Sequence, residues 1–545
     1  MQDRLFDMGY EVFAQRRELH YSLAYAIADG LCRCAQKRVL CDFSNNAACY
    51  TGSELLSASI LLSRELRRLV GNSGRVGVVI PPSYLANVCN YACVFAGLTP
   101  VNLNFTLGKS AAQSCFKTAG IRYVLSSADI AAKISKANPN FPWAENFIDA
   151  AQFLASAPRS DFDAVADSVS RGSDFFVEKY GIEKKTSDPL AEGTLIFTSG
   201  SEGDPKAAVL TQRNIIANCL QSHVSKLFDD ESDIMLGNLP VFHSFGLLFE
   251  VWYLAIFGLE IVMQNSPLDI KNNIRAIRER KATAIIATPT FLRAYMKHAS
   301  AEDLSSLRKV IAGAEKTPAA FEELWNKKFG RSYCEGYGLT EASPIVGVNL
   351  PNADYGYFST GTRKGSIGKL YVGMQARILS PETLTPMPFG ERGLLALRGP
   401  NVFAGYLNNP SATAKALHGD WLVTGDLSRI DSEGFIFIEG RLSRFSKIGG
   451  EMVPHTTVEA VLNAELGFAG SDVPKIAISS RIDEGKGEAL VLLSTVELSL
   501  AAAKDALRRA GISNLWHPKY MVLVDEIPHL ASGKLDLKKM AELAK

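Results

Sequence analysis

The sequence predicts an α/β protein with a large N-terminal domain and a small C-terminal domain. The chain has 545 residues, which is too long for one compact core. Short apolar runs alternate with helix-like stretches through much of the chain, a pattern typical of parallel sheets covered by helices on both faces. Residues 365–438 are richer in strand-like runs and in glycine and proline turns, which predicts a β-rich subdomain.

Individual elements follow from the same patterns. Helices are predicted over 83–97 and 274–281. The apolar stretch 245–263 is predicted to be a buried helix and strand, because Glu250 and Glu260 would be costly in lipid. Buried strands are predicted for the short apolar runs 75–80, 123–127, 193–199, 260–263, 282–288 and 309–314.

Composition narrows the class of protein. Apolar residues make up 47% of the chain and charged residues 21%, with a formal net charge of +1, so we expect a globular protein that does not bind nucleic acid. The nine cysteines have no framework spacing, which predicts free thiols and a cytoplasmic protein. The C-x-C pair Cys32 and Cys34 has no second pair to complete a metal site. Residues 1–21 contain no apolar signal region, and contact with a membrane surface is left open.

The stretch 195–211, "LIFTSGSEGDPKAAVLT", interrupts two apolar runs with small, flexible and hydroxylated residues. Glycines let backbone N–H groups approach an anion, hydroxyls donate hydrogen bonds, and a lysine adds positive charge. The order of residues differs from the GxxxxGK[ST] loop, and a plain turn is the alternative. The candidate phosphate-binding residues are Thr198, Ser199, Gly200, Ser201, Glu202, Gly203 and Lys206.

Four further motifs follow in order: "NLPVFHSFGL" (238–247), "GYGLTEASP" (336–344), "WLVTGDLSRIDSEGFIFIEGR" (421–441) and "SGKLDLKK" (532–539). With the loop, this series resembles the adenylate-forming superfamily of acyl- and aryl-CoA synthetases, peptide adenylation domains and luciferases. The resemblance covers roughly residues 50 to 540, and five motifs in order are far more specific than one. It implies an adenylation domain over 1–441 and a small, mobile α+β domain over 442–545.

The resemblance also implies a nucleotide site. Tyr337, followed by Gly338, would stack on adenine, and Glu315 would line the same pocket. Asp426 would accept hydrogen bonds from the ribose hydroxyls, with Arg441 reaching the ribose or the phosphates. Without the family, Tyr337 reads as packing and Asp426 as a turn residue.

Catalytic roles are implied in the same way. Thr340 would hydrogen-bond the α-phosphate, and Glu341 would hold Mg²⁺, a cation that prefers carboxylate oxygen. Lys534 would bind the incoming carboxylate and the α-phosphate, where a positioned ammonium stabilises developing negative charge. "GLTE" alone could be a helix capping box, and Lys534 alone an ordinary surface lysine. The place of the family's charged hinge residue is taken by Ser443.

The acyl site is placed by the motif "NLPVFHSFGL" (238–247). His243, Phe242 and Phe245 resemble the residues near the acyl group, although such residues are more often plain core. An apolar tunnel suits a fatty acid, since each buried CH₂ contributes about 0.8 kcal/mol.

Variant motifs such as "TSGSEG", "FHSFGL", "AGAEK" and "KGEALVL" resemble one branch, the acyl–acyl carrier protein synthetase half of 2-acylglycerophosphoethanolamine acyltransferase/synthetase. That branch implies ATP- and Mg²⁺-dependent activation of a fatty acid, followed by transfer to holo-acyl carrier protein. The alternatives are a long-chain fatty acid–CoA ligase and a non-catalytic nucleotide- or lipid-binding paralogue. An acidic carrier protein would need a basic dock, for which Arg441, Arg444, Lys447, Arg508 and Arg509 are candidates.

Overall fold

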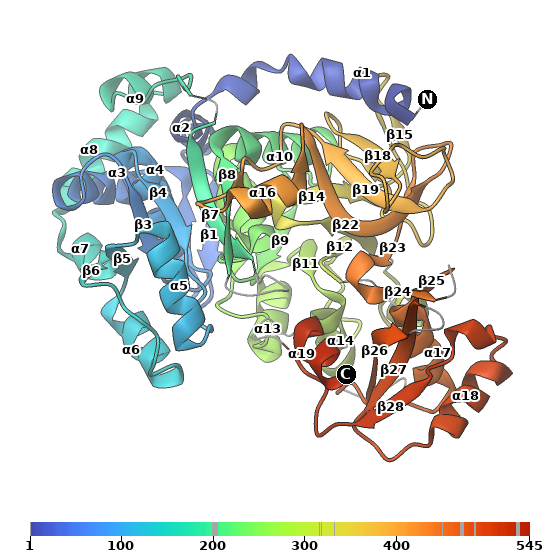
Figure 1. Cartoon of the computed structure of the whole chain (residues 1–545). Coiled ribbons are helices and arrows are strands. Elements are labelled where there is room, and N and C mark those ends of the chain that lie inside the picture. Colours follow the sequence, from blue (N-terminus) through green and yellow to red (C-terminus); the bar gives the residue numbers. More distant parts are fainter. Residues whose placement is uncertain are drawn as a thin grey trace.

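The computed structural model describes residues 2–188, 190–198, 205–315, 317, 319–331, 333–448, 451–468, 473–483, 487–529 and 535–545. Two large sheets, one of nine and one of seven strands, make up most of the fold. A five-stranded sheet follows them in the chain, and a second five-stranded sheet lies at the C-terminal end (Figure 1). The predicted α/β class with a β-rich subdomain is confirmed.

The seven-stranded sheet is mainly parallel, as its continuous apolar runs predict. Its helical connections are α4 (Tyr84–Ala96), α5 (Lys109–Ala119) and α6 (Ala128–Ala137), with α7 (Ala150–Ser156), α8 (Arg159–Ser170) and α9 (Ser173–Lys179) in a longer excursion. The strands, in spatial order, are β20 (Gly405–Tyr406), β8 (Lys206–Thr211), β7 (Glu192–Thr198), β4 (Thr99–Asn102), β3 (Arg75–Val78), β5 (Tyr123–Ser126) and β6 (Asn146–Asp149).

Helix α4 matches its prediction closely because both ends carry local signals. The Ser83 side chain accepts a hydrogen bond from the Ala86 N–H and caps the start of the helix. Gly97 ends it with φ of 81°, the left-handed conformation that glycine adopts readily.

The nine-stranded sheet holds a parallel block from β13 to β1 with antiparallel strands at both edges. Its central strands are connected by helices α13 (Ile270–Arg280), α14 (Pro289–His298) and α15 (Ala319–Phe329). Three further helices of the part before residue 444 are α2 (Leu23–Arg33), α3 (Gly52–Leu69) and α10 (Gln212–Val224). The strands, in spatial order, are β17 (Lys369–Leu370), β14 (Ile345–Val348), β13 (Cys334–Gly338), β12 (Lys309–Ala312), β11 (Ala284–Ala287), β9 (Ile234–Gly237), β10 (Glu260–Met263), β1 (Arg38–Asp42) and β2 (Ala48–Thr51).

The stretch 245–263 is a buried helix and strand as predicted, but part of the helix is a π-helix over Leu247–Tyr253. Side chains of α4 bond to its carbonyls: Asn87 Nδ2 donates to the carbonyl of Glu250 at 2.8 Å, and the Tyr91 hydroxyl to that of Val251 at 2.7 Å. Burial raises the pKa of the Glu250 carboxyl well above its ordinary value, although backbone N–H donors oppose that shift. Among the described residues, no helix has the length and apolar character needed to cross a bilayer.

The β-rich part consists of β18 (Gln375–Leu379), β19 (Gly393–Arg398), β21 (Leu417–His418), β22 (Trp421–Ile430) and β23 (Ile436–Arg441). Beside it lie the hairpin β15 (Ala353–Asp354) and β16 (Ser359–Thr360), and α16 (Pro410–Ala416). The N-terminal helix α1 (Gln2–Ala14) runs along this part of the molecule (Figure 1). It is tied there by a 2.6 Å hydrogen bond from Gln375 Nε2 to Asp7 Oδ1.

Residues after 444 form a sheet with hydrophobic clusters of its own on both faces. One cluster packs α17 (His455–Glu465) and α18 (Leu500–Arg509), and the other packs against α19 (Leu537–Leu543). The strands are β24 (Phe445–Ile448), β25 (Glu451–Pro454), β26 (Ile476–Asp483), β27 (Gly487–Ser494) and β28 (Tyr520–Leu523).

The prediction that all nine cysteines are free thiols is wrong for one pair. Cys41 on β1 and Cys49 on β2 face each other in the hairpin register and form a disulfide. The sequence spacing does not show this pairing, because it depends on where the hairpin turns. Cys32 and Cys34 are buried free thiols, and burial raises the pKa of Cys32 to about 12. The described part of the chain contains no cluster of potential metal ligands.

Candidate active site

Several predicted motifs meet near the end of β13, the start of β8 and the middle of β22. Tyr337 on β13 reaches Asp426 on β22, and Glu341, just beyond β13, reaches Tyr406 on β20. Tyr406 in turn lies against Lys206, the first residue of β8. Side-chain contacts thus form two groups, one of Tyr337, Asp426 and Arg441 and one of Glu341, Tyr406 and Lys206. The two groups are close enough for Glu341 and Tyr406 to act electrostatically on Arg441.

Asp426 lies inside strand β22, so its interpretation as a turn residue is wrong. In the antiparallel register it faces Arg441 of β23, and Arg441 Nε lies 2.9 Å from Asp426 Oδ1. The Tyr337 hydroxyl donates to the other carboxylate oxygen, Oδ2. The Asp426 side chain is 5% exposed, so this carboxylate is a buried charge that is paired with a cation and hydrogen-bonded.

The same environment shifts the titration of its neighbours. Burial raises the pKa of the Tyr337 phenol well above its ordinary value, and the Asp426 carboxylate adds to the effect. For Arg441, burial acts to lower the pKa, but Asp426, Tyr337, Glu341 and Tyr406 together outweigh it, and the pKa is raised. At neutral pH the cluster therefore holds a neutral phenol and a guanidinium cation around Asp426.

Thr340 and Glu341 lie in a 3-10 helix, Thr340–Ala342, between β13 and β14. This helix has no side-chain cap, so the capping-box interpretation of "GLTE" is wrong. Glu341 Oε1 accepts a 2.6 Å hydrogen bond from the Tyr406 hydroxyl, and Thr340 Oγ1 lies 3.3 Å from Ser244 Oγ. Gly338 is needed before this turn, because a Cβ there would lie 2.3 Å from the carbonyl oxygen of Pro344.

The candidate phosphate loop joins β7 to β8, an antiparallel pair in which Thr198 faces Lys206. Thr198 Oγ1 donates to the Lys206 carbonyl at 3.5 Å. Lys206 Nζ lies 5.6 Å from the centroid of the Tyr406 ring, a cation–π contact. The predicted residues between these strands, Ser199, Gly200, Ser201, Glu202 and Gly203, lie outside the described residues.

The candidate acyl residues lie on the segment that leads into the π-helix. Phe242 is buried edge-on against Phe105, with ring centroids 5.3 Å apart, whereas His243 is exposed. Phe245 is half-buried beside Gly313, where a Cβ would lie 3.2 Å from the Phe245 ring. Gly313 directly follows β12, so Phe245 approaches the carboxyl edge of the nine-stranded sheet.

Glu315, the candidate for the adenine pocket, lies two residues beyond Gly313. Its Oε2 accepts hydrogen bonds from the hydroxyl of Thr290 at 2.7 Å and from the Thr290 N–H at 3.3 Å. These bonds link the ends of β11 and β12, and Glu315 makes no described contact with Tyr337. Its carboxylate thus ties the segment after β12 to the first turn of α14.

The candidate hinge lies between two anchored arginines. Arg441 donates to the carbonyl of Thr424 at 3.1 Å, within the β-rich sheet. Arg444 is buried in the C-terminal unit, where its guanidinium donates to both carboxylate oxygens of Glu459 at 2.6 Å. Ser443 is exposed in the short helix between them. The predicted catalytic Lys534 lies outside the described residues.

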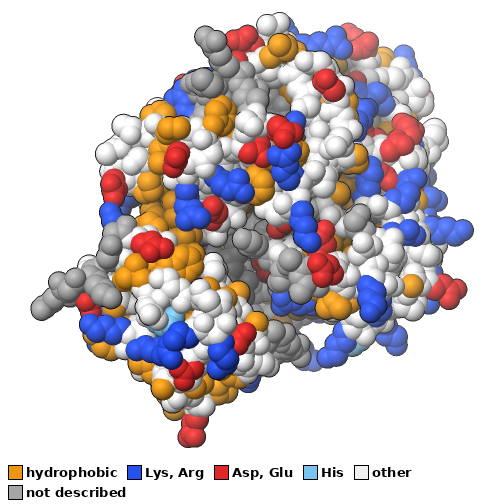
Figure 2. All heavy atoms as spheres, turned by 90° about the vertical axis from the view of Figure 1, so that its right-hand side faces the viewer, with side chains coloured by type: hydrophobic (Ala, Val, Ile, Leu, Met, Phe, Trp, Pro, Cys, Tyr) orange, Lys and Arg blue, Asp and Glu red, His pale blue; other side chains and the backbone are white. Residues whose placement is uncertain are grey.

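The proposed basic dock is not a patch of unpaired cations. Arg441 and Arg444 are paired as described above, and Lys447 pairs with Glu382. In the same way, Arg508 pairs with Asp505 and Arg509 with Glu465. Basic and acidic side chains are likewise interspersed over the face of the molecule shown in Figure 2.

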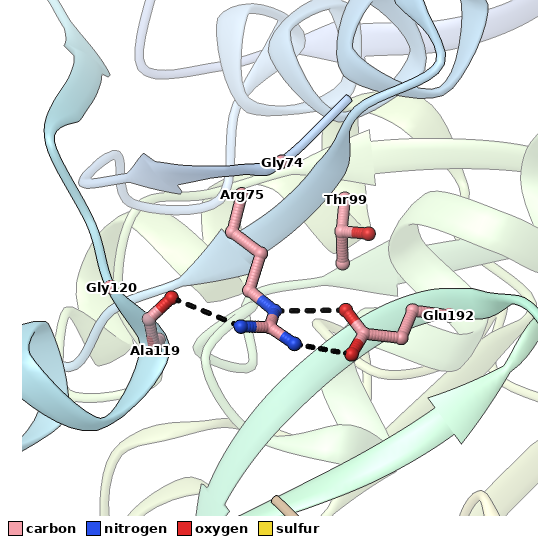
Figure 3. A pocket seen from close by; sticks show the side chains of 6 residues that line it. All are labelled: Gly74, Arg75, Thr99, Ala119, Gly120 and Glu192. Atoms are coloured by element: carbon pink, nitrogen blue, oxygen red, sulfur yellow. Dashed lines mark hydrogen bonds and ion pairs between the residues drawn. The ribbon is translucent and has the colours of Figure 1, made fainter. Parts of the chain in front are cut away.

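A shallow pocket lies elsewhere, between Gly74, Arg75, Thr99, Ala119, Gly120 and Glu192 (Figure 3). Arg75, Thr99 and Glu192 are the first residues of the strands β3, β4 and β7, so the pocket lies at the amino edge of the sheet. Ligands of parallel sheets bind at the opposite, carboxyl edge. Arg75 donates to both oxygens of Glu192, at 2.8 and 2.5 Å, and this ion pair clamps β3 to β7 across β4.

Tyr406 is the residue of this cluster that the sequence motifs do not single out. It stands in "AGYLNNP" (404–410), where the glycine, the two asparagines and the proline are typical of an ordinary turn. Only the pairing of β20 with β8 brings its ring to Lys206.

Comparison with known proteins identifies relatives of this chain. A long-chain-fatty-acid–CoA ligase of Bacillus subtilis (strain 168) is 30% identical over 356 residues, covering 64% of this chain and 61% of that protein. A long-chain-fatty-acid–CoA ligase of Escherichia coli O6:H1 is 28% identical over 358 residues, with coverage of 64% and 61%. The chain thus spans less than two thirds of the length of these curated relatives.

Solved structures share the fold at low sequence identity. An anthranilate–CoA ligase in complex with anthranoyl-AMP has a TM-score of 0.76 and 22% identity, covering 97% of this chain and 98% of that one. The o-succinylbenzoate–CoA synthetase of Bacillus subtilis, in complex with its acyl-adenylate, has a TM-score of 0.76 and 21% identity, with coverage of 94% and 97%. Residues 33–407, more than half of the chain, match the AMP-binding enzyme family. The chain therefore belongs to the AMP-binding enzyme family.

Proposed function

We propose that the chain is an AMP-forming acid–thiol ligase that activates a fatty acid with ATP and transfers the acyl group to the thiol of CoA. The observation that carries this proposal is the cluster joining Lys206, Tyr337, Glu341, Asp426 and Arg441. It combines two cations, two carboxylates and a flat aromatic ring from three different sheets. The fatty acid is supported by the names of the relatives from Bacillus subtilis and Escherichia coli.

In this proposal the cluster binds ATP. Asp426 accepts hydrogen bonds from the two ribose hydroxyls, which replace the Tyr337 hydroxyl and free that ring to stack on adenine. Arg441, already held beside Asp426, lies at the ribose and phosphates. Lys206 and the loop after Thr198 hold the phosphates through an ammonium, hydroxyls and backbone N–H groups.

The residues after β13 fit a divalent cation. Glu341 offers carboxylate oxygen and Thr340 a hydroxyl, the hard donors that Mg²⁺ prefers. Mg²⁺ bound with ATP would neutralise phosphate charge there. Four similar structures are described as bound to ATP, and one of these as containing magnesium as well.

The first half-reaction joins the acid to AMP. A carboxylate oxygen of the fatty acid bonds to the α-phosphorus, and the bond from that phosphorus to the bridging oxygen breaks, releasing pyrophosphate. Thr340 donates to an α-phosphate oxygen, and Lys534 holds the carboxylate and the α-phosphate together. The positions of the reacting groups and the stabilisation of negative charge in the transition state accelerate this step. Phe242, His243 and Phe245 lie at the acyl group.

The second half-reaction transfers the acyl group. The thiol loses its proton to solvent, its sulfur bonds to the acyl carbon, the bond from that carbon to the phosphate oxygen breaks, and AMP leaves. We assign residues 1–441 to an adenylation domain and 442–545 to a domain that turns about Ser443 between the steps. Such a rotation lets one site exclude water during adenylation and then admit a thiol.

The acceptor separates two candidate functions. The names of the relatives favour CoA. The C-terminal arginines Arg508 and Arg509 each have an acidic side chain beside them, so they offer less net positive charge to an acidic carrier protein. Holo-acyl carrier protein is the second candidate, because the variant motifs of the sequence resemble the acyl carrier protein branch.

A thiol competition tests this choice. Purified protein receives ATP, Mg²⁺ and a long-chain fatty acid together with equimolar CoA and holo-acyl carrier protein, and each thioester is quantified by mass spectrometry. We expect acyl-CoA as the main product. If acyl carrier protein thioester is the main product, the acceptor is the carrier protein and not CoA. If AMP is released but neither thioester forms, the proposed transfer step is wrong.

A further inference from the structure

Tyr406 touches both a carboxylate and an ammonium of the cluster. Its hydroxyl donates to Glu341 Oε1 at 2.6 Å, a charge-assisted hydrogen bond. Its ring lies 5.6 Å from Lys206 Nζ, within cation–π range. The side chain is half-buried, so these contacts are partly shielded from water.

The backbone of Tyr406 is fixed relative to Lys206. Tyr406 faces Ala208 in the antiparallel pairing of β20 with β8, the strand that Lys206 begins. The N–H of Tyr406 donates to Thr413 Oγ1 of α16 at 2.9 Å. The ring therefore has a set position over the first residues of β8.

The same segment also holds the backbone of Glu341. The N–H of Phe403 donates to the Glu341 carbonyl at 2.9 Å. The rings of Phe403 and Tyr406 pack edge to face, with centroids 4.9 Å apart. One short segment thus fixes both the main chain and the side chain of Glu341.

We propose that Tyr406 is a positioning residue that couples the metal-binding carboxylate to the phosphate-binding lysine. The phenol donates to Oε1 of Glu341 and so leaves Oε2 for the divalent cation. The ring fixes the position of the Lys206 ammonium through the cation–π contact. This inference rests on the proposed function, which gives Glu341 and Lys206 those roles. Tyr406 lies outside the predicted motifs. In this proposal its two contacts set the distance between the metal-binding carboxylate and the phosphate-binding lysine.

The test separates the two contacts by substitution. Tyr406→Phe removes the hydroxyl and keeps the ring, whereas Tyr406→Leu removes both. Tyr355→Phe is the matched control, because Tyr355 packs its ring on Phe358 in the separate β15–β16 hairpin. Thermal unfolding of each variant shows whether the fold is retained. Binding of ATP is measured by calorimetry over a series of MgCl₂ concentrations and in EDTA, so that no turnover is needed.

We expect Tyr406→Phe to raise the MgCl₂ concentration for half-maximal ATP binding by about tenfold, the effect of losing a hydrogen bond to a charged group. Binding in EDTA should stay within about twofold, because the ring is retained. Tyr406→Leu should show the same Mg²⁺ effect and also weaken binding in EDTA by about threefold. Tyr355→Phe should match the wild-type protein in both.

Glu341→Gln separates failure of this inference from failure of the proposed function. If Glu341→Gln raises the Mg²⁺ requirement and Tyr406→Phe does not, the positioning role of Tyr406 is wrong and the metal role of Glu341 stands. If neither variant changes the requirement, the metal role is wrong and the inference falls with it. A loss of ATP binding in Tyr406→Phe that is the same with and without Mg²⁺ would also overturn the inference.

Discussion

Replacing Asp426 with alanine should raise the KM for ATP by about 100-fold, because two ribose hydroxyls lose a charged acceptor. The same change leaves the Arg441 guanidinium without its partner at 2.9 Å and the Tyr337 hydroxyl without its acceptor. Steady-state kinetics with ATP as the varied substrate measure the effect. The KM for the fatty acid should change far less, because the proposed role of Asp426 is to hold the ribose and not the acid.

Two variants control this experiment. Asp426→Asn keeps the shape and one acceptor oxygen, so its KM should rise less, by about tenfold. Asp431 directly follows β22 and pairs with another arginine, Arg363. Asp431→Ala therefore removes an ion pair outside the proposed ribose site and should leave the KM unchanged. An unchanged KM in Asp426→Ala would remove this residue from the ribose site. A rise of equal size in Asp431→Ala would show a general effect of losing an ion pair.

Lys534→Ala should slow adenylate formation by about 100- to 1,000-fold, the range for removing one group that stabilises transition-state charge. Thioester formation from supplied acyl-adenylate should stay within a few-fold of wild type, because the proposed rotation of the C-terminal domain removes Lys534 from the site before that step. The two half-reactions are measured separately, as pyrophosphate release without thiol and as acyl-CoA formation from synthetic acyl-adenylate.

Lys538→Ala is the control for this prediction, because Lys538 is an exposed lysine on α19, four residues further along the chain. It should leave both half-reactions unchanged. An equal loss of both half-reactions in Lys534→Ala would contradict the rotation about Ser443. An unchanged rate of adenylation would contradict the catalytic role of Lys534 itself.

The sequence predicts most of this fold because its strands are continuous apolar runs. The run 260–263 coincides with β10, and the ends of α4 coincide with Ser83 and Gly97, which carry their own capping chemistry. Burial and capping are local properties, so they can be read from neighbouring residues. The π-helix over Leu247–Tyr253 is not predicted, and two of its carbonyls accept hydrogen bonds from Asn87 and Tyr91 of another helix, a contact that local sequence does not show.

The sequence motifs contain most residues of the candidate site, Tyr406 excepted, but they do not give the contacts between them. Asp426 and Arg441 stand out in their motifs, whereas their ion pair depends on an antiparallel register that shifts between Leu427 and Ser428. The contact of Tyr406 with Glu341 depends on β20 pairing with β8 across nearly 200 residues of chain. The disulfide between Cys41 and Cys49 has the same origin, a hairpin register that no spacing rule gives.

Acid-dependent exchange of labelled pyrophosphate into ATP, with no thiol present, is the most direct test of the central claim that this chain forms an acyl-adenylate. The assay reports the reversal of the first half-reaction and does not depend on the acceptor. We predict that label enters ATP when Mg²⁺ and a long-chain fatty acid are present, and does not when the acid is omitted. ATP cleavage to ADP and phosphate, or binding of ATP without exchange in the presence of any carboxylic acid, would contradict the account.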